Sequence, residues 1–304
     1  MLGRISRALS HAARVGEAPD LGSFCGPGTH WEETSARCEI DGETSSLPTG
    51  LSTFYIDQEV QGVVEQRRFL VAAPTTFEQG RAYPLLFAFH GNGGSGDGFV
   101  STFSSWVAAG DFIGIYPDGM SNSWNLGPEA SEADDVAFVE SIVAELAGYP
   151  EADTDRILAF GSSNGAGLVH LLAIETNLFD GVAAFVTSLL VNNPPPATSY
   201  SVGVLQVLGT ADGLVPYTGG VGVLGHEFMD AEESARIWAE ANSCSLPGTT
   251  NTTAEGNIEI RYSGCTNDVD VVHYGIVDAG HGLPASAEGG LTPLAVNFLL
   301  SQPD

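Results

Sequence analysis

The pentapeptide GSSNG at residues 161–165 places a serine where a sharp turn of the chain could make it reactive. Residues 156–160 before it predict a short buried strand, and residues 166–176 after it carry apolar side chains at helical spacing. A Gly-x-Ser-x-Gly motif between a strand and a helix is typical of a nucleophile elbow, whose glycines relieve crowding around the serine. Ser163 is therefore the candidate nucleophile.

A serine hydroxyl is a weak nucleophile, so it needs a base beside it and a carboxylate that orients the base. In this type of fold the acid and then the histidine follow the serine along the chain. Asp212 comes just after an apolar strand predicted at 202–208, and His281 comes just after a strand predicted at 269–277. Because open α/β sheets build their sites at the carboxyl ends of strands, we predict a triad of Ser163, Asp212 and His281.

Other residues fit these roles less well. His226 falls in a loop and could line the site, but it follows no strand. His273 lies within a predicted strand and is expected on one face of the sheet, while Asp278 is expected to be a turn residue. A simple turn is also the alternative for Asp212, because Gly213 follows it.

The Gly-rich loop 90–96 follows an apolar strand predicted at 84–89 and could supply an oxyanion hole. Its glycines let the backbone approach a substrate with its N–H groups pointing inward. We expect the donors to be the backbone N–H groups of Asn164 and Asn92, with Gly93 as neighbour. A tight turn without a catalytic part is the alternative. Phosphate binding is excluded, because no Gly-Lys-Ser/Thr follows and the chain has no lysine.

Seven motifs follow one another between residues 65 and 300: HGNGG at 90–94, YPDG at 116–119, SWN at 123–125, DDVAF at 134–138, GSSNG at 161–165, GTADGLVPY at 209–217, and Gly280-His281. In this order they resemble the secreted polyhydroxybutyrate depolymerase and feruloyl esterase group of α/β-hydrolases, which overlaps carbohydrate esterase family 1.

The resemblance implies an α/β-hydrolase fold with a mostly parallel central sheet and helices on both faces. It matches Ser163, Asp212 and His281 to the family's triad, and Asn92 to the second oxyanion position, where relatives often have cysteine. It also implies that Trp124 lies beside the acyl or alcohol group of the substrate. On its own, an aromatic residue in a polar loop could equally well pack beneath that loop.

Residues next to the motifs complete the expected substrate site: His90, Gly93, Leu214, Val215 and Leu283. Members of the family usually show His-Thr-Trp-Pro after the catalytic strand, whereas this chain has HGLP at 281–284. An aromatic wall is thus missing, so the resemblance does not define the acyl group.

The 304 residues, 43% of them hydrophobic, are enough for one large α/β domain, which we expect at 51–304. Strands alternate with helical segments from 84 to 188, and two β-rich runs within 52–74 predict an antiparallel start to the sheet. The segment from 188 to 202 is too short for a large lid domain. An open cleft would suit a bulky or polymer-attached ester.

The charge balance is extreme, with 38 acidic residues against 10 basic ones, all arginine, and a formal net charge of −28. Such a chain repels nucleic acid, and its composition favours a salt-adapted protein. No apolar run reaches about 18 residues, so no membrane span is expected. Asp134 and Asp135 precede a predicted helix and are expected to cap it and to favour its dipole.

Four cysteines form two sequence-local pairs, Cys25 with Cys38 and Cys244 with Cys265, although three pairings are possible. No zinc spacing is present, and we expect neither a metal nor a cofactor. Disulfides favour a secreted or periplasmic protein. Residues 1–19 are basic, and we expect them to be disordered or a targeting remnant, but they lack the apolar core of a signal peptide. Residues 20–50 would form a small Cys-bracketed extension.

The sequence thus predicts a monomeric serine hydrolase of carboxylic esters. Feruloyl or acetyl esters of polysaccharides, polyhydroxybutyrate and aromatic polyesters are the expected substrates. A serine peptidase of the same fold is one alternative, although it would usually carry an extra domain that selects peptides. A non-catalytic extracellular binding module is the other, and would require a degraded triad.

Overall fold

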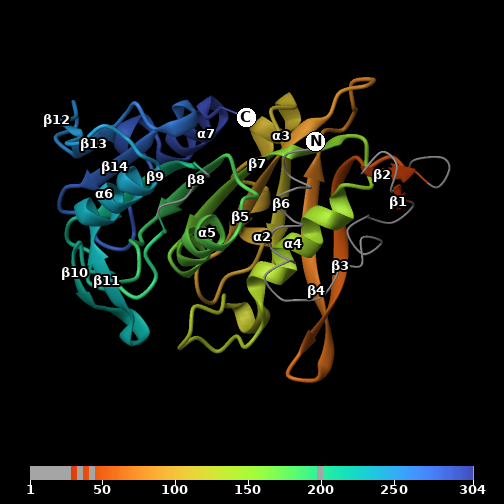
Figure 1. Ribbon diagram of the computed structural model, residues 1–304, viewed down its shortest axis with the longest axis horizontal. Coiled ribbons are helices and arrows are strands. Elements are labelled where there is room, and N and C mark those ends of the chain that lie inside the picture. The colour runs from red at the N-terminus through yellow and green to blue at the C-terminus, as the bar shows by residue number, and fades with distance from the viewer. Residues whose placement is uncertain (1–28, 33–36, 41–44, 197–200, 304) are drawn as a thin grey trace.

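The computed structural model describes residues 29–32, 37–40, 45–196 and 201–303, and a ten-stranded sheet crosses the molecule (Figure 1). In spatial order its strands are β12 (Thr249–Thr252), β13 (Ile258–Tyr262), β14 (Val271–Ile276), β9 (Gly203–Gly209), β8 (Gly181–Phe185), β7 (Ala152–Ser162), β5 (Tyr83–Phe89), β6 (Ile113–Pro117), β4 (Val63–Ala73) and β3 (Gly50–Val60).

The six central strands, from β14 to β6, run parallel, and two antiparallel strands flank them at each edge. The central strands consist mostly of buried apolar residues, because both faces of the sheet are covered there. At one edge, β3 and β4 form a hairpin whose two turn residues, Gln61 and Gly62, both have positive φ. The predicted antiparallel start of the sheet is confirmed.

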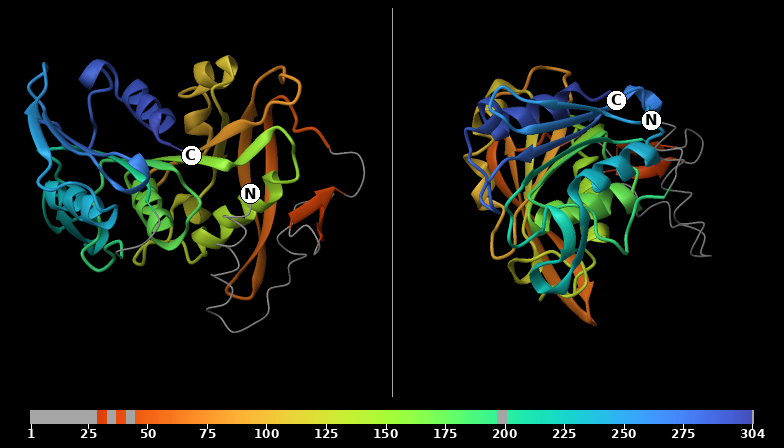
Figure 2. Two further views of the ribbon diagram at one scale, coloured as in Figure 1. Left: turned by 45° about the horizontal axis from the view of Figure 1, so that its top comes forward. Right: turned by 90° about the vertical axis from the view of Figure 1, so that its left-hand side faces the viewer.

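Helices cover both faces of the sheet, as the predicted fold class requires (Figure 2). Side chains from α4 (Asp135–Leu146), α5 (Asn164–Glu175) and α6 (Ala231–Ala241) share one core cluster. Side chains from α2 (Asp97–Val100), α3 (Ser104–Ala109) and α7 (Leu291–Ser301) share the other. Alternate residues of β5 point into the two clusters, with Leu85 in the first and Leu86 in the second.

Two small antiparallel pairs lie outside this sheet: β1 (Thr29–Glu32) with β2 (Arg37–Ile40), and β10 (Thr218–Val221) with β11 (Glu227–Asp230). Short 3-10 turns occur at η2 (Met120–Asn122), η3 (Val223–Gly225), η4 (Thr266–Asp268) and η5 (Ala287–Gly289). In the described part of the chain, no helix lies between β8 and β9, and no helix is both long and apolar enough to cross a bilayer.

Cys244 and Cys265 form a disulfide that joins the end of α6 to the segment after β13. The sequence-local pairing of these two cysteines is confirmed. Closing a loop of this size stabilises the folded chain by about 3 kcal/mol, mainly by restricting the unfolded one. The predicted Cys25–Cys38 pair falls outside the described residues and stays a prediction.

A buried ion pair fixes the long loop between β6 and α4. Asp134 caps α4 by accepting from the Ala137 N–H at 2.9 Å, as predicted. Asp135 does more than favour the helix dipole, because it accepts from the Arg67 guanidinium on β4 at 2.7 Å, and both side chains are buried. Its other oxygen accepts from the Asn125 N–H at 2.7 Å. The loop is therefore tied to the sheet at one end and to the helix at the other.

Two buried histidines make the stability of the fold sensitive to acid. Burial lowers the pKa of His170 to about 4 and that of His273 to about 3. In the unfolded chain both would titrate near the ordinary pKa of about 6.5. The unfolded state therefore binds more protons below pH 6.5, and acid favours unfolding.

We accordingly expect the contribution of these histidines to the free energy of unfolding to be complete above pH 6.5 and to fall as the pH drops towards 4. Urea unfolding at half-unit pH steps measures this loss. A His273→Gln variant is the matched control, because glutamine does not titrate, so its pH slope should be shallower than that of the wild type. Identical slopes for the two proteins would contradict the prediction.

Candidate active site

Ser163 sits in a sharp turn between β7 and α5 with φ 55° and ψ −121°, a strained conformation for a residue other than glycine. Its N–H donates to the Phe185 carbonyl at 2.9 Å, which ties the turn to β8. The flanking glycines are required by close contacts. A Cβ on Gly161 would lie 2.4 Å from the Gly165 carbonyl oxygen, and one on Gly165 would lie 2.1 Å from the Phe89 oxygen. The turn therefore has the backbone geometry that a nucleophile elbow requires.

The structure brings the three residues of the predicted triad together. His281 Nε2 lies 2.8 Å from Ser163 Oγ, and His281 Nδ1 lies 2.7 Å from Asp212 Oδ2. Because the buried carboxylate accepts at Nδ1, the neutral imidazole carries its proton there and leaves Nε2 free to accept from the serine hydroxyl. The other oxygen of Asp212 accepts from the N–H groups of Leu214 and Val215, at 2.8 and 3.0 Å.

Two of the three rival residues, His273 and Asp278, lie away from the cleft, whereas His226 lines it. His273 is fully buried, with its ring nitrogens 2.8 Å from Tyr217 Oη and 3.0 Å from Gln206 Nε2. Asp278 is exposed in a turn with φ 59°, and its N–H donates to Thr210. Both match what the sequence predicts for them.

Asn92 and Asn164 both line the cleft beside Ser163. No hydrogen bond joins the backbone N–H of either residue to another described residue. The Asn92 loop is braced by its neighbours, because the Gly93 N–H donates to the Asn122 carbonyl and the Gly96 N–H donates to Asp118, both at 2.7 Å. Two unpaired donors in a braced loop and at a helix start are what an oxyanion hole requires.

His90 holds this loop in place instead of contacting substrate. Its Nε2 accepts from the Gly119 N–H at 2.9 Å, and its Nδ1 donates to the Gly91 carbonyl at 2.8 Å, so the ring is neutral. Burial lowers the pKa of His90, which favours the same neutral form. The predicted substrate contact of His90 is therefore wrong, and its neighbour Gly93 is also absent from the cleft lining.

Trp124 is fully buried, and the alternative that it packs beneath its own loop is correct. Its Nε1 donates to the His90 carbonyl at 2.8 Å, and its ring meets Phe89 edge-on at 5.4 Å between centroids. Leu283 is half-buried and packs against the core cluster on the α7 side, away from the cleft lining. Neither residue contacts the cleft, contrary to expectation.

The cleft in front of Ser163 has a volume of about 340 Å³. Its apolar lining includes the predicted Leu214 and Val215, together with Leu126, Leu190, Val223, Leu224 and Phe228. Its polar lining includes, besides Ser163, His281 and the two asparagines, the side chains of Glu129, Thr187 and His226. One wall is built by β11 and by the turn that joins it to β10, within a segment that shows no regular pattern in the sequence.

The sequence gives no signal for Glu129, since this residue lies in a loop of Gly, Pro, Ala and Ser.

Within the described ranges, no group of three or more His, Cys, Asp or Glu side chains is placed to hold a metal.

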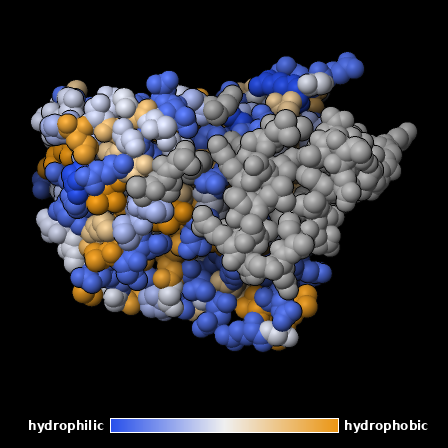
Figure 3. Space-filling model, in the orientation of Figure 1, coloured by the Kyte–Doolittle hydropathy of each residue, from blue (hydrophilic) through white to orange (hydrophobic). Residues whose placement is uncertain are grey.

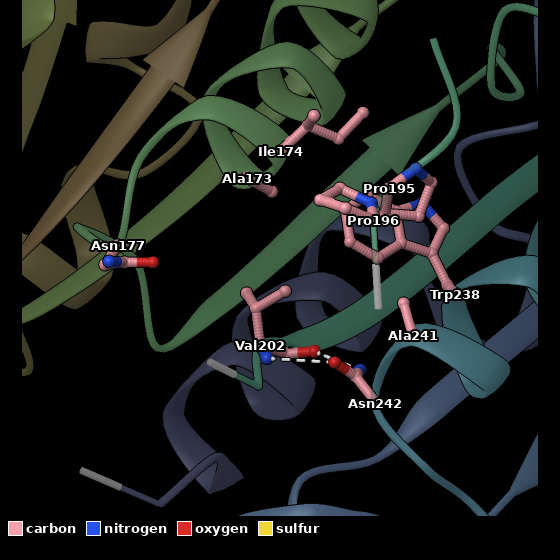
Figure 4. Close-up of a pocket in the computed structure, with 9 residues that line it drawn as sticks. All are labelled: Ala173, Ile174, Asn177, Pro195, Pro196, Val202, Trp238, Ala241 and Asn242. Carbon is pink, nitrogen blue, oxygen red and sulfur yellow. Dashed lines mark hydrogen bonds between the residues drawn. The ribbon is translucent and has the colours of Figure 1, made fainter. Parts of the chain in front are cut away.

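A separate hollow lies between α5, α6 and the start of β9 (Figure 4). It measures about 30 Å³, and one of its two polar side chains, Asn242, already forms hydrogen bonds with the backbone of Val202, at 2.7 and 3.3 Å. It has room for little more than water.

A mostly parallel sheet with a serine elbow, and with an acid and a histidine after later strands, defines an α/β-hydrolase. No family model matches the chain. It is 30% identical to feruloyl esterase B of Piromyces equi over 231 residues, which cover 71% of the chain and 42% of that protein. It is 26% identical to a probable feruloyl esterase C of Aspergillus clavatus, over 75% of the chain and 80% of that protein.

Among solved structures, the acetyl xylan esterase from Aspergillus awamori superposes with a TM-score of 0.56, covering 82% of this chain and 98% of that one at 14% identity. This similarity confirms the fold. The chain belongs to the feruloyl esterase group of the α/β-hydrolases. It spans less than half the length of the Piromyces equi protein.

Proposed function

We propose that the chain is a serine hydrolase of carboxylic esters. The unbroken line of hydrogen bonds from Ser163 through His281 to Asp212, with distances of 2.8 and 2.7 Å, is the observation that carries this proposal. The names of the relatives support it, since each is a feruloyl or acetyl xylan esterase.

The reaction would proceed in two acyl transfers. His281 Nε2 takes the proton of the Ser163 hydroxyl as the serine oxygen attacks the ester carbonyl, and the Asn92 and Asn164 N–H groups stabilise the resulting oxyanion. Collapse of this intermediate breaks the ester bond, and His281 gives its proton to the leaving alcohol. Water then attacks the acyl-serine with the same assistance, which releases the acid and restores the serine. Asp212 keeps the imidazole in the required tautomer.

We propose a bulky or polymer-attached ester as the substrate, with feruloyl and acetyl esters of polysaccharides favoured over polyhydroxybutyrate and aromatic polyesters. An apolar rim beside the cleft supports this, since Leu214 and Leu224 are 48% and 52% exposed. Hydrophobic residues also reach the surface on the side of the molecule that holds β10 and β11 (Figure 3). The disulfide favours a protein that works outside the cytoplasm, and we propose that it does so as a monomer comprising a catalytic domain from residue 51 onwards.

A panel of four substrate classes tests the proposal. We expect turnover of feruloyl and acetyl esters, weaker turnover of hydroxybutyrate oligomers, and no cleavage of peptides. Product acid is measured by chromatography, and a fluorophosphonate that labels Ser163 provides an active-site titration. Faster cleavage of peptides than of esters would favour the peptidase, and no turnover of any substrate would favour a binding module.

A further inference from the structure

The cleft contains a second histidine–carboxylate pair that the triad does not use. His226 Nε2, in front of β11, lies 2.6 Å from Glu129 Oε1, in the loop between β6 and α4. The side chains are only 8% and 2% exposed, and both residues line the cleft that contains Ser163. The pair joins two walls of the cleft that are far apart in the sequence.

Glu129 acts as an acceptor for several donors. Its Oε2 accepts from the Leu126 N–H at 2.9 Å, and its Oε1 also receives the Asn164 side-chain amide at 3.4 Å. A carboxylate surrounded in this way accepts from His226, so the proton of the imidazole sits on Nε2. With this proton on Nε2, Nδ1 on the other side of the imidazole is the nitrogen that can accept a hydrogen bond.

This second nitrogen has no partner of its own. No described residue forms a hydrogen bond with His226 Nδ1. Because Nδ1 is also not one of the fully buried polar atoms without a partner, a molecule in the cleft can reach it. The ring is held firmly, because Glu129 fixes one side and the Phe228 ring packs against it at 5.8 Å between centroids. An open acceptor on a fixed ring, in a wall otherwise made by Leu190 and Val223, is suited to recognise a hydrogen-bond donor.

We propose that His226 determines specificity by accepting, at Nδ1, a hydrogen bond from a hydroxyl group on the part of the ester that fills this cleft. The inference rests on the proposed ester hydrolysis. Glu129 is a positioning residue, since it acts on the substrate only through the imidazole. The hydroxyl could belong to the acyl or to the alcohol part, and both are open to test.

Two pairs of esters separate these sources. Methyl 4-hydroxycinnamate against methyl cinnamate tests the acyl part, and 4-hydroxyphenyl acetate against phenyl acetate tests the alcohol part. We expect the wild type to favour the hydroxylated member of one pair about tenfold in kcat/KM, the effect of one hydrogen bond. Because phenol and 4-hydroxyphenol differ in reactivity as leaving groups, the kcat/KM ratio of the two acetates is interpreted by comparing the wild type with the variants.

Two variants of His226 separate recognition from support. His226→Gln places its amide where Nε2 lies and keeps a bond to Glu129, but removes the acceptor at Nδ1. His226→Asn places its amide where Nδ1 lies and loses Glu129. We expect the ratio of kcat/KM values within the responsive pair to fall about tenfold in the glutamine variant and to persist, reduced, in the asparagine variant. Leu214→Ala, which shortens an apolar part of the same cleft, should leave the ratio unchanged.

Each outcome decides the question. Equal kcat/KM ratios in the wild type and the glutamine variant for both pairs would overturn the inference while leaving the ester hydrolase intact. A ratio lost in the asparagine variant and kept in the glutamine variant would also overturn it, because His226 would then only support the wall. A wild type that hydrolyses none of the four esters would remove the proposed function itself, and this inference with it.

Discussion

Replacing Ser163 with alanine should lower kcat for ester hydrolysis by about 10⁶-fold, because the removal of a triad nucleophile leaves only binding and oxyanion stabilisation. The Ser163 Oγ bonds only to His281 among the described residues, so the fold should be unaffected. Initial rates with a nitrophenyl ester measure the loss, and urea unfolding measures the stability.

Asp212→Asn is the graded comparison for this variant. The amide would still accept from the N–H groups of Leu214 and Val215, but would hold the imidazole of His281 in the wrong tautomer. We expect a loss of about 10⁴-fold in kcat for this variant.

A Ser163→Ala protein that retains more than a hundredth of the wild-type rate would contradict the first prediction, because the nucleophile would then be another residue.

Gly165→Ala should lower the free energy of unfolding by about 4 kcal/mol or more. A loss this large is exceptional for a single substitution, and we expect it because the backbone would have to move. The added Cβ would lie 2.1 Å from the Phe89 carbonyl oxygen and 2.5 Å from that of His90. These atoms belong to β5 and to the start of the Asn92 loop, so no flexible side chain can relieve the clash. Activity should fall with stability, because the same movement shifts the oxyanion donors.

Gly98→Ala is the matched control for that prediction. A Cβ on Gly98, in α2, meets no atom within 4 Å, and its backbone does not have a positive φ. Alanine is favoured over glycine in a helix by about 1 kcal/mol. We therefore expect unchanged or slightly raised stability in urea and full activity. Equal behaviour of the two alanine variants would contradict the close contact at Gly165.

The triad and the elbow could be predicted because their signals are local. Ser163 is marked by glycines on both sides, and Asp212 and His281 each follow a strand whose apolar residues are visible in the sequence. A parallel sheet then brings those strand ends to one edge, so the meeting of the three residues follows from the fold class. The α/β architecture was predictable for the same reason, since buried strands alternate with helical segments.

Apart from Leu214, Val215 and His226, which the sequence places near the site, the walls of the cleft were not predictable, because they depend on where loop side chains point. Trp124 packs inward against Phe89, a choice that the sequence leaves open. Glu129 and His226 meet across 97 positions of the chain, and no local pattern marks either of them. The β10–β11 pair was missed because glycines break the alternation that normally reveals a strand.

The excess of negative charge on the protein would affect the last step of the reaction, in which the product acid leaves the cleft. Ester cleavage converts a neutral molecule into an acid that is anionic at pH 7, and a protein with a formal net charge of −28 repels that anion. We expect departure of the acid to be assisted at low ionic strength and inhibition by it to be weak. Salt at about 1 M shortens the reach of this repulsion to about 3 Å, so inhibition by the released acid should strengthen in brine.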